Sequence, residues 1–430
     1  MNEAFARRTL IILMVLSALP VLLATPLPEF TSLEGYALYL GELVGYLGLT
    51  MLLWQYVMGV RSLSGLVFRD LAPVLRIHKA LGKYGSLFIF AHPLLMALNY
   101  MQLSVLIPTE LPDFSDPFQV GLSLGRVAMG LLVTVWLTSA FFRTRLSYRS
   151  WKYIHFLAYF VLPFALVHVP LVGTRFIDND VLRTYYFVIV LTLLIATVLR
   201  LRGWLNTNRT TYRVTGHQQV ADGTYQLDVA ADDSNRRALP GRAGQYVYVK
   251  HGIVSEDHPF SIMSINDDNI TLGYRTEGRF TQYLATLNVG DTISLNGPYG
   301  TFLGDVDPER AVFVAGGIGI TPFYDYVLTA KTKPWLFYAN RSHSSAPFLT
   351  QLKVQLGNRF VAVFSQDEPR KNEMKGYVDL PLLTARLGND LHKYDFYICG
   401  PPVMNESLTK ALREAGVADM SIRVEPFDFR

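Results

Sequence analysis

The chain has 430 residues, of which half are apolar and only 17% are charged, and this length predicts about two to four domains. Its 39 Lys and Arg against 35 Asp and Glu give a formal net charge of +4, and no cluster of basic residues indicates a nucleic-acid partner. The single cysteine, Cys399, excludes an intramolecular disulfide and is typical of a reducing compartment.

Six hydrophobic blocks precede residue 203, and each is about as long as a bilayer-spanning helix. They occupy residues 9–25, 35–59, 78–100, 120–142, 152–172 and 182–202. The first block is long and lacks a convincing cleavage site, so we interpret it as a retained span rather than a signal peptide. The loops alternate in charge: Arg143, Arg145 and Arg149 lie in a basic loop, whereas the loop at 110–116 is acidic. By the positive-inside rule, both termini are predicted to face the cytoplasm.

Four histidines lie on the third and fifth predicted spans: His78, His92, His155 and His168. Ionisable side chains at membrane depth are costly and indicate function. Neutral imidazole is a usual axial ligand of haem iron. Because spans three and five run in the same direction, His78 and His155 are predicted near the inner face, and His92 and His168 farther out. Two haems stacked across the membrane are therefore predicted.

The spacing of the histidines supports the two pairs unequally. In an ideal helix, the 14 residues from His78 to His92 cover about 21 Å and nearly a whole number of turns. The 13 residues from His155 to His168 leave the second about 140° away from the first, but Pro163 between them can kink the helix. A single histidine could equally be a core residue bonded to a carbonyl. Zinc is a competing metal, yet structural zinc needs four ligands close together.

Beyond about residue 210 the pattern changes to short alternating strands, with one helix near 281–287, which predicts a small antiparallel barrel. Two motifs in it, 258–261 (HPFS) and 274–281 (YRTEGRFT), carry histidine, arginine, glycine and threonine. Such residues beside a helix start suit an anionic phosphate. Ordinary turn chemistry is the alternative interpretation of each motif alone.

From residue 311 a continuous apolar strand is followed by the glycine turn 316–322 (GGIGITP) and a predicted helix at 323–330. Strand, glycine turn and helix are the context that a dinucleotide pyrophosphate site requires. Further strands at 335–339, 359–364 and 395–398 predict a doubly wound α/β domain. Cys399 and the Gly-Pro-Pro sequence follow the last strand, where such sheets hold ligands; a lone cysteine is otherwise usually buried packing.

In this order, the motifs resemble those of the NADPH oxidase and ferric reductase superfamily, specifically its compact bacterial members. The resemblance covers nearly the whole chain and includes the histidine spacings of 14 and 13 residues, with Trp151 four residues before His155. It implies a multidomain membrane protein: a six-helix transmembrane bundle in 1–207, an antiparallel β-barrel FAD domain in 208–306, and an α/β nucleotide-binding domain in 307–430, ferredoxin-NADP reductase-like.

The resemblance also implies roles for single residues. His78 and His155 are expected to hold an inner b-type haem, and His92 and His168 an outer one. Residues expected to bind FAD are His258, Pro259, Phe260, Ser261, Tyr274, Arg275, Gly278 and Thr281. Residues expected to bind NADPH are Gly316, Gly317, Gly319, Thr321, Arg341, Gly400 and Pro401; Arg341 would recognise the 2′-phosphate. The catalytic candidates are Cys399, near the nicotinamide, and Phe429, stacked on the flavin with Phe427 as a rival.

The implied activity is electron transfer from cytoplasmic NADPH through FAD and two haems to an acceptor outside the bacterial inner membrane. We expect O2 as the acceptor, giving superoxide. Ferric chelate is the alternative, and the acidic loop at 110–116 is compatible with attracting metal cations. A subunit that donates electrons to a protein is a third hypothesis, and a transporter or receptor without redox chemistry is the least favoured. Membrane lipid surrounds the spans, and with no sensor segment or long insertion we expect no obligatory protein activator.

Overall fold

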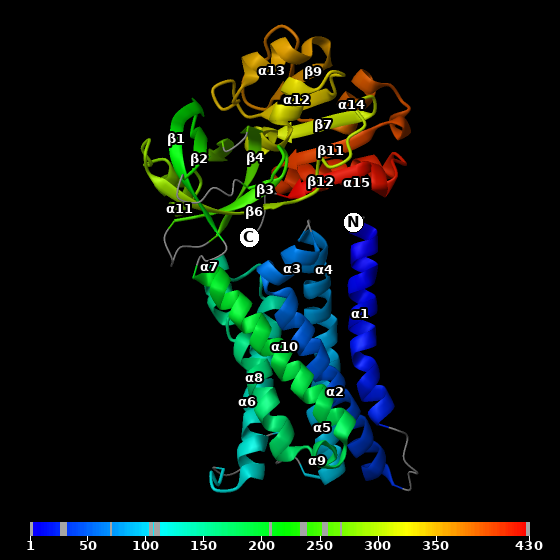
Figure 1. The fold of residues 1–430 in the computed structure, drawn as a ribbon. Helices are drawn as coiled ribbons and strands as arrows, with labels where there is room; N and C mark the ends of the chain where they lie inside the picture. Colours follow the sequence, from blue (N-terminus) through cyan, green and yellow to red (C-terminus); the bar gives the residue numbers. More distant parts are fainter. Residues whose placement is uncertain are drawn as a thin grey trace. The chain divides into compact units, whose positions relative to one another are not determined.

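The computed structural model describes residues 3–25, 32–68, 71–102, 106, 112–205, 209–232, 239–251, 257–266 and 269–426. The chain forms two compact units, Met1–Gly203 and Trp204–Arg430. The first contains helices alone within its described residues, and the second contains a β-barrel and a parallel sheet (Figure 1). The predicted domain boundaries at 207 and 306 stay predictions.

The first unit is a bundle of long apolar helices. Its helices are α1 Glu3–Ala24, α2 Leu33–Met58, α3 Arg61–Val67, α4 Ala72–Ala80, α5 Ser86–Tyr100, α6 Pro117–Ala140, α7 Tyr148–His155, α8 Ala158–Val172, α9 Thr174–Asp178 and α10 Asp180–Trp204. Among the residues that the structure describes, six stretches are long and apolar enough to cross a membrane: Arg7–Ala24, Leu33–Met58, Pro73–Tyr100, Pro117–Ala140, Tyr148–Val172 and Asp180–Gly203. The six predicted spans are thereby confirmed, by length and composition.

Helix α10 illustrates how these helices divide their surface. Phe187, Leu191 and Leu194 recur every three to four residues and are more than half exposed, whereas Ile189 and Leu193 are buried against the bundle. In water such a stripe would be costly, but lipid tails are as apolar as the side chains themselves. The exposed stripe is therefore the surface expected of a helix in a membrane.

Spans three and five are not regular helices between their histidines. A π-helical turn, Leu81–Gly85, joins α4 to α5. Between α7 and α8 the amides of Leu157, Tyr159 and Phe160 bond three residues back, as in a 3-10 helix. The π turn unwinds span three, and the tighter turn overwinds span five. Both changes reduce the rotation of about 100° by which ideal 14- and 13-residue spacings differ. Neither span therefore follows the ideal-helix geometry from which the spacings were compared.

The second unit begins with a closed six-stranded barrel, as predicted. Its strands are β1 Thr210–Ala221, β2 Thr224–Ala231, β3 Tyr246–Lys250, β4 His258–Asn266, β5 Asn269–Arg275 and β6 Thr292–Tyr299, in the order β1-β2-β5-β4-β3-β6. The predicted helix is α11, Arg279–Leu284. Every neighbouring pair is antiparallel, and alternate residues such as Tyr212 and Val214 fill the interior.

A six-stranded parallel sheet follows. Its strands are β7 Ala311–Gly316, β8 Trp335–Asn340, β9 Phe360–Phe364, β10 Glu373–Lys375, β11 Asp395–Gly400 and β12 Ile422–Pro426, and its helices are α12 Tyr324–Thr329, α13 Leu349–Leu356, α14 Leu380–Leu387 and α15 Pro402–Glu414. The order β10-β9-β8-β7-β11-β12 has β7 flanked by β8 and β11. The chain thus reverses its direction of winding at β7, and open α/β sheets bind ligands at such a switch point. The predicted fold class is confirmed.

Candidate functional site

The four histidines meet in two pairs across spans three and five. The ring centroids of His78 and His155 are 6.2 Å apart, with planes at 68°. Those of His92 and His168 are 6.3 Å apart, with planes at 84°. The sequence therefore identified the correct partners, although neither span is an ideal helix.

These centroid distances fit a metal atom between two imidazoles. A metal–imidazole bond is about 2.0–2.1 Å long, and with ring bonds of about 1.35 Å each nitrogen lies about 1.1 Å from its ring centre. Two imidazoles on one metal atom would therefore have ring centroids about 6.2–6.4 Å apart. Direct packing of two rings does not require this distance at both pairs. The residues present therefore fit haem iron with two axial histidines.

His92 and His168, called the outer pair after their predicted position, also have the orientation that metal ligands need. His92 Nδ1 lies 2.8 Å from the carbonyl oxygen of Gly41, and His168 Nδ1 lies 2.9 Å from that of Gly121. A carbonyl can only accept, so each Nδ1 carries the proton, and Nε2 keeps its lone pair. Ligating histidines usually donate their other N–H in this way.

His78 and His155, called the inner pair after their predicted position, are held differently. His155 Nδ1 lies 3.2 Å from Ser139 Oγ, which also accepts a hydrogen bond from Trp151 Nε1 at 3.1 Å. Trp151 stacks on the His155 ring with centroids 4.9 Å apart, and the guanidinium of Arg143 covers the Trp151 ring. His78 Nδ1 is buried and has no hydrogen-bond partner among the described residues.

Zinc fits these histidines less well than haem does. Within the described residues, no three or more His, Cys, Asp or Glu side chains are grouped as metal ligands. A structural zinc site needs four ligands, whereas a haem brings four nitrogens of its own and needs two axial ligands from the protein.

The predicted flavin motif lies along β4. Ser261 and Phe260 are nearly buried, and the His258 ring stacks on Phe280 of α11 with centroids 4.0 Å apart and planes at 12°. The pairing of His258 to Ser261 with β3 fixes the direction of this strand. The motif and the start of α11 are thereby brought together, as a shared ligand would require.

The second flavin motif divides between the barrel core and the surface. Tyr274 is 2% exposed and shares a 2.7 Å hydrogen bond with His217 Nε2, so its side chain belongs to the barrel core. Arg275 remains partly exposed. At the start of α11, the amides of Glu277 and Gly278 donate to Thr281 Oγ1, each at 3.0 Å.

The glycine turn and the Cys-Gly-Pro segment meet at the ends of β7 and β11. A Cβ added to Gly319 would lie 2.0 Å from the Cys399 carbonyl oxygen, and one added to Gly316 would lie 2.7 Å from Pro401 Cδ. Gly317 has φ +56°, a left-handed conformation that favours glycine. Thr321 is buried, and its hydroxyl donates to the Ile318 carbonyl at 3.0 Å. Residues 317–323 form a 3-10 helix rather than a plain turn.

Cys399 is fully buried, and its Sγ lies 3.6 Å from the Glu425 carbonyl oxygen. Burial, with a smaller contribution from Glu425, raises the pKa of the thiol well above its ordinary value. A thiol with a raised pKa is a poor nucleophile. The structure therefore places the backbone of Cys399, rather than its sulfur, at the glycine turn. Phe427 and Phe429 lie outside the described residues.

Arg341 follows β8 at the same edge of the sheet and is exposed. It makes no ion pair within the described part of the chain. The hydroxyl of Ser342 contacts those of Ser344 and Ser345 at 3.2 and 3.0 Å. An unpaired guanidinium beside three hydroxyls is a suitable environment for a phosphate.

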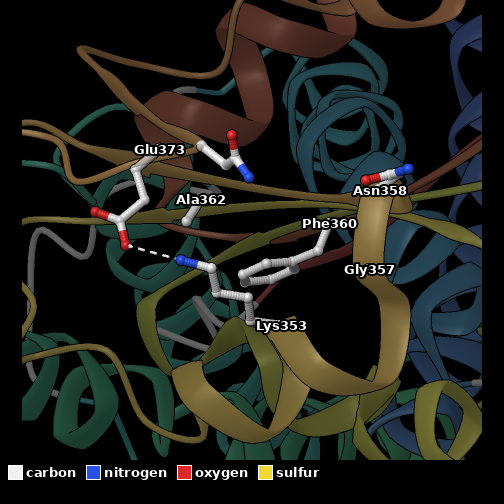
Figure 2. A pocket seen from close by; sticks show the side chains of 7 residues that line it. Lys353, Gly357, Asn358, Phe360, Ala362 and Glu373 are labelled. Atoms are coloured by element: carbon white, nitrogen blue, oxygen red, sulfur yellow. Dashed lines mark ion pairs between the residues drawn. The ribbon is translucent and has the colours of Figure 1, made fainter.

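Near this edge, His343 bridges two carboxylates. Its Nδ1 lies 2.8 Å from Asp367 Oδ2 and its Nε2 lies 2.7 Å from Glu373 Oε2. Burial acts to raise the pKa of Glu373, but hydrogen bonds from His343 and the Arg370 amide outweigh it and lower that pKa. A hollow of about 150 Å³ lies beside Glu373, which pairs with Lys353 at 3.8 Å. Figure 2 shows the side chains that line it. This hollow contains none of the predicted site residues.

Sequence reasoning missed several residues around the outer pair. Gly41 and Gly121 each accept a hydrogen bond from a histidine, and Gly45 and Gly125 lie one turn further along the same helices. Two Gly-x-x-x-Gly patterns within predicted spans were the available indication. Arg126, inside span four, is a charged residue of the kind that indicates function at membrane depth.

All three parts of the chain match known families. Residues 44–166 match the ferric reductase like transmembrane component, 227–302 an FAD-binding domain, and 313–410 an oxidoreductase NAD-binding domain. Over 165 residues the chain is 28% identical to one subunit of the Na(+)-translocating NADH-quinone reductase of Neisseria meningitidis, covering 35% of this chain and 40% of that protein. The corresponding Yersinia enterocolitica protein is 29% identical over 164 residues. The chain thus spans well under half the length of these relatives.

Among solved structures, the chain is similar to the flavohem-like FAD/NAD-binding domain of nitric oxide dioxygenase from Vibrio cholerae. The identity is 24% and the TM-score 0.45, and the similar region covers 51% of this chain and 98% of that one. A type IV self-sufficient cytochrome P450 monooxygenase is 30% identical with a TM-score of 0.44, over 52% of this chain and 28% of the other.

Proposed function

Because its three matched domains give this chain the ferric reductase and NADPH oxidase-like architecture, we propose that it carries electrons across a membrane, from NADPH through FAD and two b-type haems. It is a membrane oxidoreductase with FAD- and NAD-binding domains. When bound, FAD would accept two electrons from NADPH as a hydride and release them one at a time, and each haem would carry one electron. The acceptor proposed is O2 on the outer side of a bacterial inner membrane, with superoxide as the product.

The observation that supports this proposal most is the spacing of the two histidine pairs. Centroids 6.2 and 6.3 Å apart accommodate one metal atom each. His78 and His155 would hold the inner haem, and His92 and His168 the outer one. The protein's part would be to fix the imidazoles and to keep Nε2 unprotonated on His92 and His168.

The dehydrogenase half supplies the two nucleotide sites of the proposal. His258 to Ser261, Arg275 and the Gly278–Thr281 turn would bind FAD. The turn from Gly316 to Thr321, packed on the Cys399-Gly-Pro segment, would bind the dinucleotide at the switch point of the sheet. Exposed Arg341 favours NADPH, whereas the quinone reductase relatives are named for NADH. The ratio of kcat/KM values for the two donors decides between them.

Reduction of a ferric chelate is the second candidate, favoured by the match of residues 44–166 to the ferric reductase like component. The same donor and relay would serve it. A protein acceptor is the third, because the quinone reductase relative is, by its name, one subunit of a larger reductase.

The test is cytochrome c reduction by the purified chain in detergent, with NADPH and FAD in air, with and without superoxide dismutase. A signal that the dismutase abolishes supports superoxide formation. A signal that survives it refutes free superoxide as the product, and reduction of ferric chelates under nitrogen is then the expected activity. Purified protein that contains no haem, after expression with ample haem supply, refutes the relay itself.

A further inference from the structure

The two outer histidines are supported in the same way by two different helices. On α2, a Cβ added to Gly45 would lie 2.9 Å from His92 Nδ1 and 3.0 Å from its Cε1. On α6, a Cβ added to Gly125 would lie 2.6 Å from His168 Nδ1 and 2.8 Å from its Cε1. All these distances are below the 3.4 Å of ordinary contact.

Each of these histidines also contacts a second glycine, one helical turn earlier on the same neighbouring helix. The Gly41 carbonyl accepts the hydrogen bond of His92 Nδ1, and the Gly121 carbonyl accepts that of His168 Nδ1. The carbonyl fixes the direction of the N–H, and the glycine four residues later leaves room for the ring. Together they determine both the position and the rotation of the imidazole.

Close helix packing does not explain all four glycines. Gly-x-x-x-Gly patterns usually bring two helices together, and Gly41 and Gly121 fit that role, because added Cβ atoms there would meet Met96 Cε at 2.1 Å and Leu171 Cβ at 2.6 Å. At Gly45, by contrast, the three nearest atoms all belong to His92. At Gly125 all three belong to His168.

The inner pair lacks this construction. His155 contacts the hydroxyl of Ser139, and His78 Nδ1 has no described partner. A substitution at Gly45 or Gly125 therefore acts on one pair of histidines and leaves the other in place.

We propose that Gly45 and Gly125 are positioning residues for the outer haem. Each lies directly against one of its two ligand imidazoles and leaves just enough room for that ring. This inference rests on the proposed function. In Gly125→Ala, the His168 ring must move from 2.6 Å towards the 3.4 Å of ordinary contact, a shift of roughly 0.8 Å, and metal–ligand distances tolerate only about 0.2 Å.

The test compares Gly125→Ala with Gly130→Ala in the full chain. Gly130 is on the same helix, and an added Cβ there meets nothing within 4 Å. Haem content, low-spin absorption and EPR spectra, and a redox titration are measured on each. We expect Gly130→Ala to match the wild type, with two low-spin haems. In Gly125→Ala one haem keeps its spectrum and midpoint potential, while the other loses low-spin coordination or shifts in potential.

Gly45→Ala provides the second arm, because its added Cβ has more room and folding is less at risk. It must alter the same haem as Gly125→Ala, since His92 and His168 form one pair. Two unperturbed low-spin haems in both variants overturn the inference and leave the proposed function standing. A wild-type chain without haem overturns the proposed function instead.

Discussion

The turn Gly317–Phe323 at the proposed nucleotide site gives the sharpest prediction for the second unit. The substitution Gly319→Ala should slow reduction of the flavin by NADPH. The new Cβ would lie 2.0 Å from the Cys399 carbonyl oxygen and 2.7 Å from its carbonyl carbon. These are backbone atoms of a strand paired in register with β7, so they cannot move aside as a flexible side chain would. To bring the new Cβ and the Cys399 carbonyl oxygen to an ordinary contact of 3.4 Å, the turn must move away from β11 by more than an ångström. Overpacking of this kind costs about 1–3 kcal/mol, and a displacement of about 1 Å between reacting groups costs on the order of 100-fold in rate.

The assay is anaerobic stopped-flow reduction of bound FAD by NADPH. Gly319→Ala is expected to slow flavin reduction by roughly 100-fold while haem content stays at the wild-type level. Gly317→Ala is the matched comparison: its added Cβ meets nothing within 4 Å, so only the positive φ of 56° opposes it. That conformation costs about 1–2 kcal/mol, and we expect a smaller loss. A folded Gly319→Ala protein whose flavin is reduced at the wild-type rate would refute the close fit of turn and strand.

Three further substitutions test the other parts of the proposal. His92→Ala should remove one haem and leave flavin reduction by NADPH intact, as measured by pyridine haemochrome and stopped flow; loss of flavin reduction would contradict the order of the relay. Arg341→Ala should raise KM for NADPH by about 10-fold or more, through loss of charge-assisted hydrogen bonds, and leave KM for NADH unchanged; an equal change in both would remove Arg341 from the 2′-phosphate site. Glu373→Gln should lower stability at neutral pH by about 2 kcal/mol, because it removes a charged partner of His343. The folded-state pKa of Glu373 is lowered, so its stabilisation is present above the unfolded pKa and lost as pH falls through the folded one. The difference in melting temperature from wild type should therefore vanish in acid, and a constant difference would argue against this.

The sequence was sufficient wherever one local pattern decides the structure. Apolar length predicted all six spans. Alternation predicted the barrel, and the buried strand at 311–315 placed Gly316 and Gly319 at the start of the nucleotide turn. The side chain of Cys399 could not be placed in this way, because its burial depends on Glu425, whose strand β12 comes last in the sheet. The hydrogen bond between Tyr274 and His217 of β1 likewise joins strands that are far apart in the chain, and the assignment of Tyr274 to FAD stays a prediction.

The histidine pairs could be identified but not oriented. Their partners followed from predicted depth alone, since spans three and five were predicted to run in the same direction and each carries two histidines at a similar spacing. The rotation of the imidazoles about the two helix axes depends on the π turn Leu81–Gly85 and on the tight turn after His155. No residue pattern in the sequence predicts a π turn. Hydrogen bonds to Gly41 and Gly121 join helices more than 40 residues apart in the chain, so they also lay beyond local reasoning.

The hydrogen bonds of the two pairs differ in a way that bears on the potentials of the haems that we propose they hold. Donation of a hydrogen bond from Nδ1 to a carbonyl makes an imidazole a stronger electron donor to its metal. Both outer imidazoles make that bond, whereas His155 bonds to a hydroxyl shared with Trp151 and His78 has no described partner. Stronger electron donation from an imidazole to its metal stabilises ferric iron. The ligands alone would therefore give the outer haem the lower midpoint potential. Under the proposed relay, His92 and His168 would thus favour the ferric form of the haem that they hold, and removal of the electron by the acceptor would have to draw the relay forward.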